Sequence, residues 1–348
     1  MITRSNYTNP LIARALCATA LMLSSSAKSA DLPTFVDLPS GLIIGAHAGG
    51  KWLSSEQAGK ALGPGRKYRL FTLTGKTGDA VGGKAAPNAE VCPDVWEQTL
   101  QPATEKSAIA LAVPWNPMPR TAKASDKTQN LYVKAAHDFL VSKGIAKPVV
   151  KITQLLRIDL NGDGADEVLF SATNYPGEPG ESPPSAAAGN YSFVLLRHVV
   201  DGKVQTKLID GEFYAKASQS QTPYRYEVSG LLDLDGDNDD EVLLSATHYP
   251  GEEGESPSQA EAGNYSFVLL RRVVDGMVQT KLVDGEFYPK ASESQTPYRY
   301  EVSGLLDLDG DGRLEIIIYS AYYEGATVTV WRFGEGKLHK VLEIGCGA

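Results

Sequence analysis

Three acidic loops of nine residues carry the side chains of this chain that are best suited to chemistry. They begin at Asp159, Asp233 and Asp307, so they recur every 74 residues. Each has oxygen-bearing side chains at positions 1, 3 and 5, a turn residue at position 6 and a glutamate at position 9. Oxygens at alternate positions of a curled loop suit a hard cation, and Ca²⁺ takes six to eight of them at about 2.3–2.6 Å. The spacing therefore predicts calcium loops; the alternative is a set of acidic, solvated turns.

Short apolar segments flank all three loops. The segments before them are 152–158, 226–232 and 300–306, and those after them are 168–170, 242–244 and 316–318. These segments are rich in Val, Ile, Leu, Phe and Tyr and too short for stable helices, which favours strand–loop–strand. With these flanks, the loops resemble the FG-GAP and VCBS repeats, also found in the integrin α-chain head, whose loops read D-x-[DN]-x-D-G-x-x-[DE]. In that family calcium lies in a hairpin between the first two strands of a β-propeller blade.

The resemblance implies a set of ligands for about three calcium ions. Its departure from the family is position 9, where the family more often has Asp and this chain has the longer Glu. Gly164 and Gly312 suit the positive φ of the curl, and Asn238 tolerates it. By analogy with the EF-hand, the backbone carbonyl at position 7 is an additional ligand. The predicted ligands are Asp159, Asn161, Asp163, Ala165 and Glu167; Asp233, Asp235, Asp237, Asp239 and Glu241; and Asp307, Asp309, Asp311, Arg313 and Glu315.

Residues 149–348 are expected to form three such repeats. Segments 171–237 and 245–311 share 57 of 67 residues, so one unit is a recent copy. Two further strands per repeat, joined by turns such as Asp201-Gly202, give twelve strands in four-stranded groups, as propeller blades require. We therefore predict an all-β fold of propeller-like blades. A closed ring and an open stack both remain as alternatives.

The N-terminal half is less regular. Residues 1–30 have basic residues, a short apolar run and small residues, which is typical of a secretory signal peptide and indicates a secreted or periplasmic protein. Residues 31–125 contain four strand-like segments, enough for one calcium-free blade. Residues 126–148 hold one helix, at 130–143, with Leu131, Ala135, Phe139 and Leu140 on one face, and a linker.

The charge limits the classes of partner. The chain has 33 basic and 42 acidic residues; removing residues 1–30 subtracts three basic ones, so the net charge changes from −9 to −12. Three Ca²⁺ would bring it to about −6. Since no Lys/Arg cluster offsets this charge, nucleic acid is excluded as a partner. The apolar run of the leader is too short to span a bilayer, so we expect no transmembrane segment in the mature chain.

Two cysteines remain after residue 30, Cys92 and Cys346. An isolated pair in an oxidising compartment is more often bridged than free, so a disulfide between them is predicted, with two buried thiols as the alternative. Such a bond would tie the N-terminal region to the end of the last repeat.

A Pro-, Gly- and Glu-rich loop follows the second strand in the first two repeats. Exposed loops on rigid scaffolds carry recognition, so these loops are candidates for a binding rim. Copying preserves residues whether or not they matter, so we favour a solvated insertion over the rim. The rim residues in question are Tyr175, Glu178, Glu181, Tyr249, Glu252 and Glu255.

No catalytic residue is assigned from the sequence. The histidines lack the spacing of metal-ligand pairs, and no nucleophile elbow or phosphate-binding glycine loop occurs. We expect a binding or scaffold module for protein or carbohydrate, with structural calcium. The alternative is a hydrolase or lyase on a propeller scaffold, acting on polysaccharide or a phosphate ester. An enzyme would have a pocket with perturbed carboxylates.

Overall fold

The fold is mostly β-strand, as the sequence predicts. The computed structural model describes residues 32–347, apart from 39, 89–91, 105, 107, 120, 160–163, 177–182, 184, 201, 219–222, 233–240, 249–256, 275–276 and 293. Within these residues, twenty strands form four antiparallel sheets, none of them closed on itself, and there are two helices. The leader expected at 1–30 lies outside the described residues.

The N-terminal sheet has seven strands, where the sequence predicted a blade-sized sheet of four. Its order is β3-β2-β1-β7-β4-β5-β6. The bounds are β1 Thr34–Leu38, β2 Ile43–Ala48, β3 Lys51–Leu53, β4 Lys67–Thr72, β5 Gly75–Asn88, β6 Cys92–Gln101 and β7 Ala108–Ala112. Strand β5 was missed because it is rich in Gly and has little apolar periodicity; it is held by backbone pairing with β4 and β6.

Helix α1, Ser55–Ala61, was also missed. It is only seven residues long, and a capping box between Ser54 and Gln57 satisfies its first N–H groups. Its buried Ala58 and the following Leu62 belong to one core cluster with the N-terminal sheet.

The repeats form the other three sheets, and each acidic loop joins the first two strands of one of them. This confirms the predicted strand–loop–strand arrangement. The strands are β9 Ile152–Ile158, β10 Glu167–Thr173, β11 Tyr191–Val200 and β12 Lys203–Phe213; β13 Glu227–Leu232, β14 Glu241–His248, β15 Asn264–Val274 and β16 Met277–Tyr288; and β17 Arg299–Leu306, β18 Glu315–Tyr322, β19 Gly325–Gly334 and β20 Lys337–Gly347. Each set is an antiparallel meander, and the two-residue strand β8, Lys123–Ala124, adds a fifth strand beside β9.

Helix α2 spans Asn130–Ser142, close to the predicted 130–143. Its buried face is Tyr132, Ala136 and Leu140, which pack on the sheet of β9–β12. Leu131 was expected on this face but is 60% exposed. Phe139 and Leu140 pack on the sheet as predicted, whereas Tyr132 takes the place expected of Leu131, with its ring 6.0 Å from that of Phe170 of β10.

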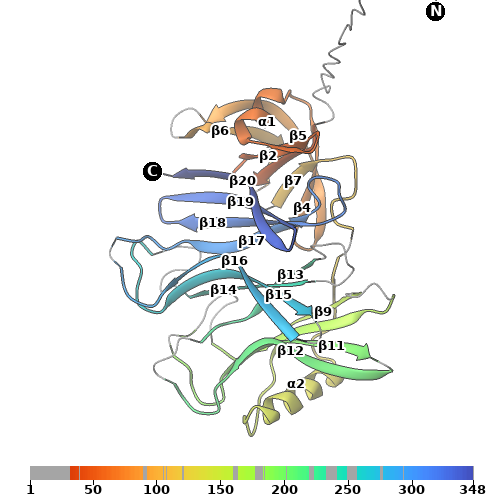
Figure 1. The fold of residues 1–348 in the computed structure, drawn as a ribbon, viewed down its shortest axis with the longest axis vertical. Helices are drawn as coiled ribbons and strands as arrows, with labels where there is room; N and C mark the ends of the chain where they lie inside the picture. The colour runs from red at the N-terminus through yellow and green to blue at the C-terminus, as the bar shows by residue number, and fades with distance from the viewer. Residues whose placement is uncertain are drawn as a thin grey trace, which may run out of the picture.

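The four sheets lie one upon another along the longest axis of the molecule (Figure 1). Apolar clusters join each neighbouring pair: the N-terminal sheet with β17–β20, β17–β20 with β13–β16, and β13–β16 with β9–β12. Helix α2 covers the outer face at the β9–β12 end. No cluster among the described residues joins the N-terminal sheet to β9–β12. Four antiparallel sheets packed in this order fit both a closed ring and an open stack, so ring closure stays a prediction.

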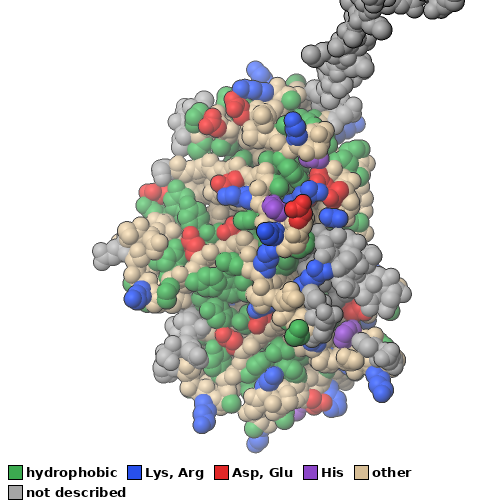
Figure 2. Space-filling view, in the orientation of Figure 1, with side chains coloured by type: hydrophobic (Ala, Val, Ile, Leu, Met, Phe, Trp, Pro, Cys, Tyr) green, Lys and Arg blue, Asp and Glu red, His purple; other side chains and the backbone are tan. Residues whose placement is uncertain are grey.

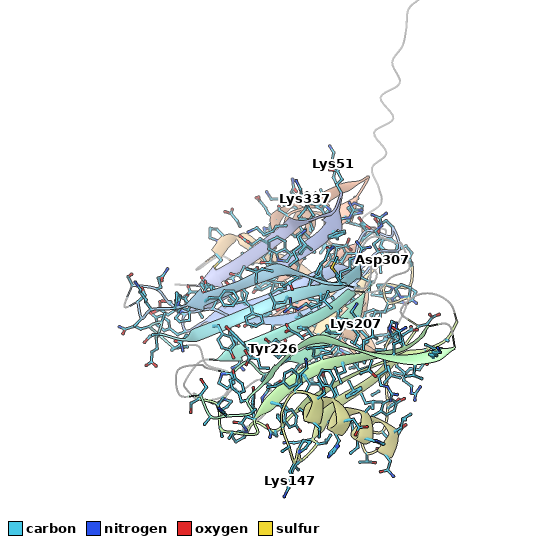
Figure 3. All side chains as sticks on the ribbon, turned by 60° about the horizontal axis from the view of Figure 1, so that its bottom comes forward. Lys51, Lys147, Lys207, Tyr226, Asp307 and Lys337 are labelled. Atoms are coloured by element: carbon cyan, nitrogen blue, oxygen red, sulfur yellow. A yellow bond between two sulfur atoms is a disulfide. The ribbon has the colours of Figure 1, made fainter. Side chains whose placement is uncertain are left out.

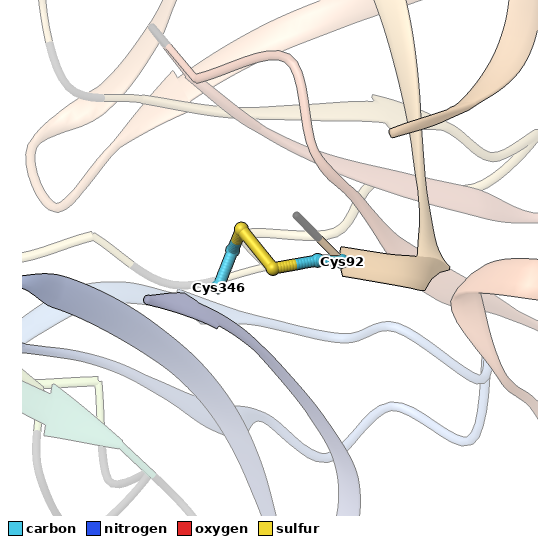
Figure 4. The surroundings of a disulfide bond; sticks show 2 residues. All are labelled: Cys92 and Cys346. Carbon is cyan, nitrogen blue, oxygen red and sulfur yellow. A yellow bond between two sulfur atoms is a disulfide. The ribbon is translucent and has the colours of Figure 1, made fainter. Parts of the chain in front are cut away.

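A disulfide links the N-terminal sheet to the last repeat. Cys92 begins β6 and Cys346 lies in β20, with their sulfur atoms 2.12 Å apart (Figure 4). The two sheets are neighbours in the stack, so the bond fixes a contact between the two halves of the chain. It closes a loop of 254 residues. Chain entropy gives such a closure about 5 kcal/mol as an upper figure.

No helix in the described part of the chain is both long and apolar enough to cross a bilayer.

Candidate metal centre

The third acidic loop is described in full, and it brings together three of its four predicted side-chain ligands. Asp307 directly follows β17 and Glu315 is the first residue of β18. Carboxylate oxygens of Asp307, Asp309 and Glu315 all lie within 4.8 Å of one another. Figure 3 labels Asp307 at the edge of the stack. The loop therefore places three hard oxygen donors around one point.

Backbone hydrogen bonds to the loop's own carboxylates set its curl. The Gly310 and Gly312 N–H groups donate to the two carboxylate oxygens of Asp307, at 2.7 and 3.1 Å. The Asp311 N–H donates to Asp309 Oδ1 at 3.1 Å. Gly312 has φ 86°, as its position in the motif predicts, and Gly310 has φ 81°. The loop's own aspartates thus hold its backbone in the curl, through hydrogen bonds that need no cation.

The segment after β7 holds this loop in place. The Trp115 indole N–H donates to the Asp307 carbonyl oxygen at 2.8 Å, and the Asp307 N–H donates to the Pro117 carbonyl oxygen at 2.8 Å. The Trp115 ring packs so closely on Gly310 that a Cβ there would lie 3.3 Å from the ring. The loop is therefore part of the contact between the last repeat and the N-terminal region.

Burial makes the charge of the cluster costly without a counter-ion. Glu315 is 0% exposed; its Oε2 accepts from the Leu308 N–H at 2.8 Å, while its Oε1 has no hydrogen-bond partner. Burial, followed by the neighbouring aspartates, raises the pKa of Glu315 to about 9. Burial raises the pKa of Asp307 and of Asp309 as well. A buried carboxylate oxygen directed at two others is the environment that a hard cation relieves.

Arg332 of β19 supplies part of the positive charge. Its guanidinium lies 3.1 Å from Asp309 and 2.5 Å from Asp311, and its Nε lies 3.6 Å from Glu315 Oε1. Asp311, the fourth predicted side-chain ligand, thus pairs with Arg332 and stands outside the close triad. Arg313, predicted to contribute its carbonyl, donates its N–H to Asp311 Oδ1 at 2.9 Å.

The sequence analysis did not identify Arg332 or Trp115. A match for Arg332 in the preceding repeat emerges only from the strand pairing. Strand pairing sets Ile316 opposite Trp331, and it sets Val242 opposite Arg271 in the preceding repeat. Arg332 therefore takes the strand position of Arg272, a match that the 74-residue period of the sequence does not give. Trp115 has no such match, because it lies outside the repeats.

The described residues of the first loop have the same geometry as their counterparts in the third loop. The Gly164 N–H donates to Asp159 Oδ2 at 2.9 Å, as Gly312 does to Asp307, and Gly164 has φ 88°. Glu167 begins β10 and is 5% exposed, and Ala165 lies in an exposed turn. Asn161 and Asp163 lie outside the described residues. So do Asp233, Asp235, Asp237 and Asp239 of the second loop, in which only the backbone of Glu241, at the start of β14, is described.

Tyr175 does not lie on an exposed rim. Its side chain is 1% exposed, and the Arg225 guanidinium donates to the carbonyl oxygens of Tyr175 and Pro176 at 3.3 and 2.9 Å. The residue thus anchors the start of the loop to the core, as an apolar ring in a tightly packed stack does. The other rim candidates, Glu178, Glu181, Tyr249, Glu252 and Glu255, lie outside the described residues.

Comparison of the chain with family models, with curated proteins and with solved structures finds no match.

Proposed function

We propose that loop 307–315 binds Ca²⁺ and that the protein is a calcium-stabilised repeat protein acting as a binding or scaffold module. The observation that carries this proposal is the buried Glu315 Oε1, which has no hydrogen-bond partner and lies beside the carboxylates of Asp307 and Asp309. A cation at that point would be held by these three residues. Its role would be to neutralise carboxylates that burial otherwise keeps protonated.

The repeat pattern extends the proposal to three ions and to a family. Strand–loop–strand units, four-stranded meanders and a period of 74 residues support an FG-GAP/VCBS-type repeat with propeller-like blades. The bond from Gly164 to Asp159 supports the same role for the first loop. The second loop is included on its sequence, since it repeats the ligand pattern of the other two.

The position of the third loop supports a structural role for the ion. The loop is bonded to Trp115 and Pro117, so an ion there would strengthen the contact between the last repeat and the N-terminal region. If residues 1–30 direct export, millimolar extracellular calcium could fill even weak sites. On the face shown in Figure 2, basic and acidic side chains of the described residues are interspersed, which favours a protein or carbohydrate partner over a polyanionic nucleic acid.

The test is a calorimetric calcium titration of the chain from residue 31 onward, with thermal melts in calcium and in chelator. About three ions and a higher melting temperature in calcium are expected by linkage. Asp159→Asn, Asp233→Asn and Asp307→Asn should each remove one ion. Asp138→Asn is the matched control, because Asp138 is exposed on α2, where it pairs with Lys134 and His137. Unchanged stoichiometry in Asp307→Asn would refute the site.

One observation favours the alternative of an enzyme. A cavity of about 510 Å³ between the N-terminal sheet and β17–β18 is lined by Asp37, Glu301 and Tyr319. Burial raises the pKa of Asp37 to about 6, whereas Glu301 is exposed and paired with Arg299 at 3.1 Å. Two carboxylates in unlike environments can divide acid and base roles. The test is a hydrolysis screen with glycosides and phosphate esters. Activity that disappears in Asp37→Asn would support this candidate, and inactivity of the wild type would count against it.

A further inference from the structure

A groove opens in the N-terminal sheet where β4 and β7 diverge. The two strands pair only from Arg69 to Phe71, opposite Leu111 to Ile109. Before that point Lys67 and Tyr68 pair with β5 alone. The resulting groove has a volume of about 1120 Å³ and is lined by residues 63–69, 79–81, 101–102 and 111–114. This is large enough for a small organic ligand.

Two arginines bridge the gap between the strands. The Arg66 guanidinium donates to the Leu32 carbonyl oxygen and, at 3.3 Å, to that of Ala112. The Arg69 guanidinium donates to the carbonyl oxygens of Val113, at 2.7 Å, and Trp115. Carbonyl groups beyond the β4–β7 ladder therefore have guanidinium partners, which satisfies the backbone without closing the gap. These hydrogen bonds fix the separation of the two strands, so the groove is part of the structure of the sheet.

The groove is cationic in an acidic protein. Arg66, Lys67 and Arg69 line it, whereas the chain as a whole carries −9. Asp79 is the one carboxylate among its described lining residues, and Lys76 Nζ lies 2.7 Å from that carboxylate. Lys67 and Arg69 have no carboxylate partner among the described residues. This charge is complementary to an anion.

The rest of the lining is mainly apolar. Val81 is 43% exposed, and it lines the groove with Leu111, Val113 and Pro102. A ligand that matches both features has an apolar body and an anionic head. We propose that this groove binds an amphipathic organic anion, with an oxyanion head at Lys67 and Arg69 and a hydrocarbon body along Val81. This inference goes beyond the proposed function, adds a second class of ligand to it and does not depend on the calcium loops.

The experiment compares ligands that share a ten-carbon chain and differ in the head group. Decanesulfonate and decanoate are titrated calorimetrically into the wild type at submicellar concentrations, with decyltrimethylammonium and decyl maltoside as the cationic and neutral controls. Both anions should bind at one site, at least about tenfold more tightly than either control. Decanoate binding without decanesulfonate binding would restrict the head to carboxylate; binding of both assigns a general oxyanion site.

Lys67→Glu is the variant, because Lys67 is exposed and its replacement disturbs no described ion pair. Decanesulfonate affinity should fall by at least about tenfold, and it should be unchanged in Lys147→Glu. Lys147 is exposed and lies near α2, at the end of the molecule away from the N-terminal sheet (Figure 3).

Equal binding of the cationic and anionic ligands, or unchanged affinity in Lys67→Glu, would overturn the inference. If Lys67→Glu does not fold, the salt dependence of decanesulfonate binding to the wild type is the test. Affinity that falls with added salt supports an ionic contact, and affinity that does not fall overturns it, since salt weakens an ionic contact and not a purely apolar one. Calcium titration of the same samples separates the two proposals. Calcium binding without decanesulfonate binding would refute the groove alone.

Discussion

Replacing Glu315 with glutamine should change the stability of the protein in opposite directions with and without calcium. Glu315 is fully buried and its pKa is raised from 4.5 to about 9. A folded state with a raised acid pKa binds more protons than the unfolded state, so its stability falls as pH rises from about 4.5 to 9. At pH 7 without metal, keeping this side chain protonated costs about 3 kcal/mol, at 1.36 kcal/mol per pH unit above 4.5.

Glutamine is neutral at every pH and keeps an oxygen for the Leu308 N–H. In chelator at pH 7, Glu315→Gln should therefore be more stable than the wild type, by up to about 3 kcal/mol. At pH 5 the gain should nearly vanish.

In saturating calcium the order should invert. The wild type gains about 4 kcal/mol at a thousand times the dissociation constant of this site, whereas the variant loses a ligand and much of that gain. The assay is urea unfolding of both proteins at pH 5 and pH 7, in calcium and in chelator. A variant less stable than the wild type in chelator at pH 7, or equally stabilised by calcium, would refute the reasoning.

Two further predictions follow from buried contacts. Asp37 is 6% exposed, and burial raises its pKa from 3.8 to about 6, so its contribution to stability is lost as pH rises through that window. Asp37→Asn should be more stable than the wild type above pH 6, by up to about 3 kcal/mol, and equal to it below pH 4; parallel pH profiles of the unfolding free energy would contradict this. Gly230→Ala should destabilise the contact between β13 and β17 by about 1–3 kcal/mol, because the new Cβ would lie 1.9 Å from Leu305 Cδ1. Thermal melts should show that Gly230→Ala lowers the melting temperature less in the Leu305→Ala background than in the wild type. An equal decrease in both backgrounds would exclude the clash with Leu305 as the cause.

Local sequence determines the loops and strands of the repeats. Strand segments follow from apolar residues in short runs, and the positive φ of Gly164 and Gly312 follows from position 6 of the motif. The bonds from these glycines back to Asp159 and Asp307 span only five residues. Such contacts depend on neighbours in the chain, so the sequence alone predicts them. The pairing of Cys92 with Cys346 was also predicted, although only because no other pair remains after residue 30.

Tertiary packing decided the rest. The burial of Glu315, the bond from Trp115 across 192 residues and the approach of Arg332 exist because the last sheet packs on the N-terminal region. Packing also placed Tyr175 in the core and put Tyr132 in place of Leu131 on the buried face of α2. It added β5 to a sheet that its own composition does not predict. The oxygen donors of the candidate site thus all come from nine consecutive residues. The burial of these donors and the pKa values of their carboxyl groups depend on which sheet packs against the loop, and no local sequence pattern determines that packing.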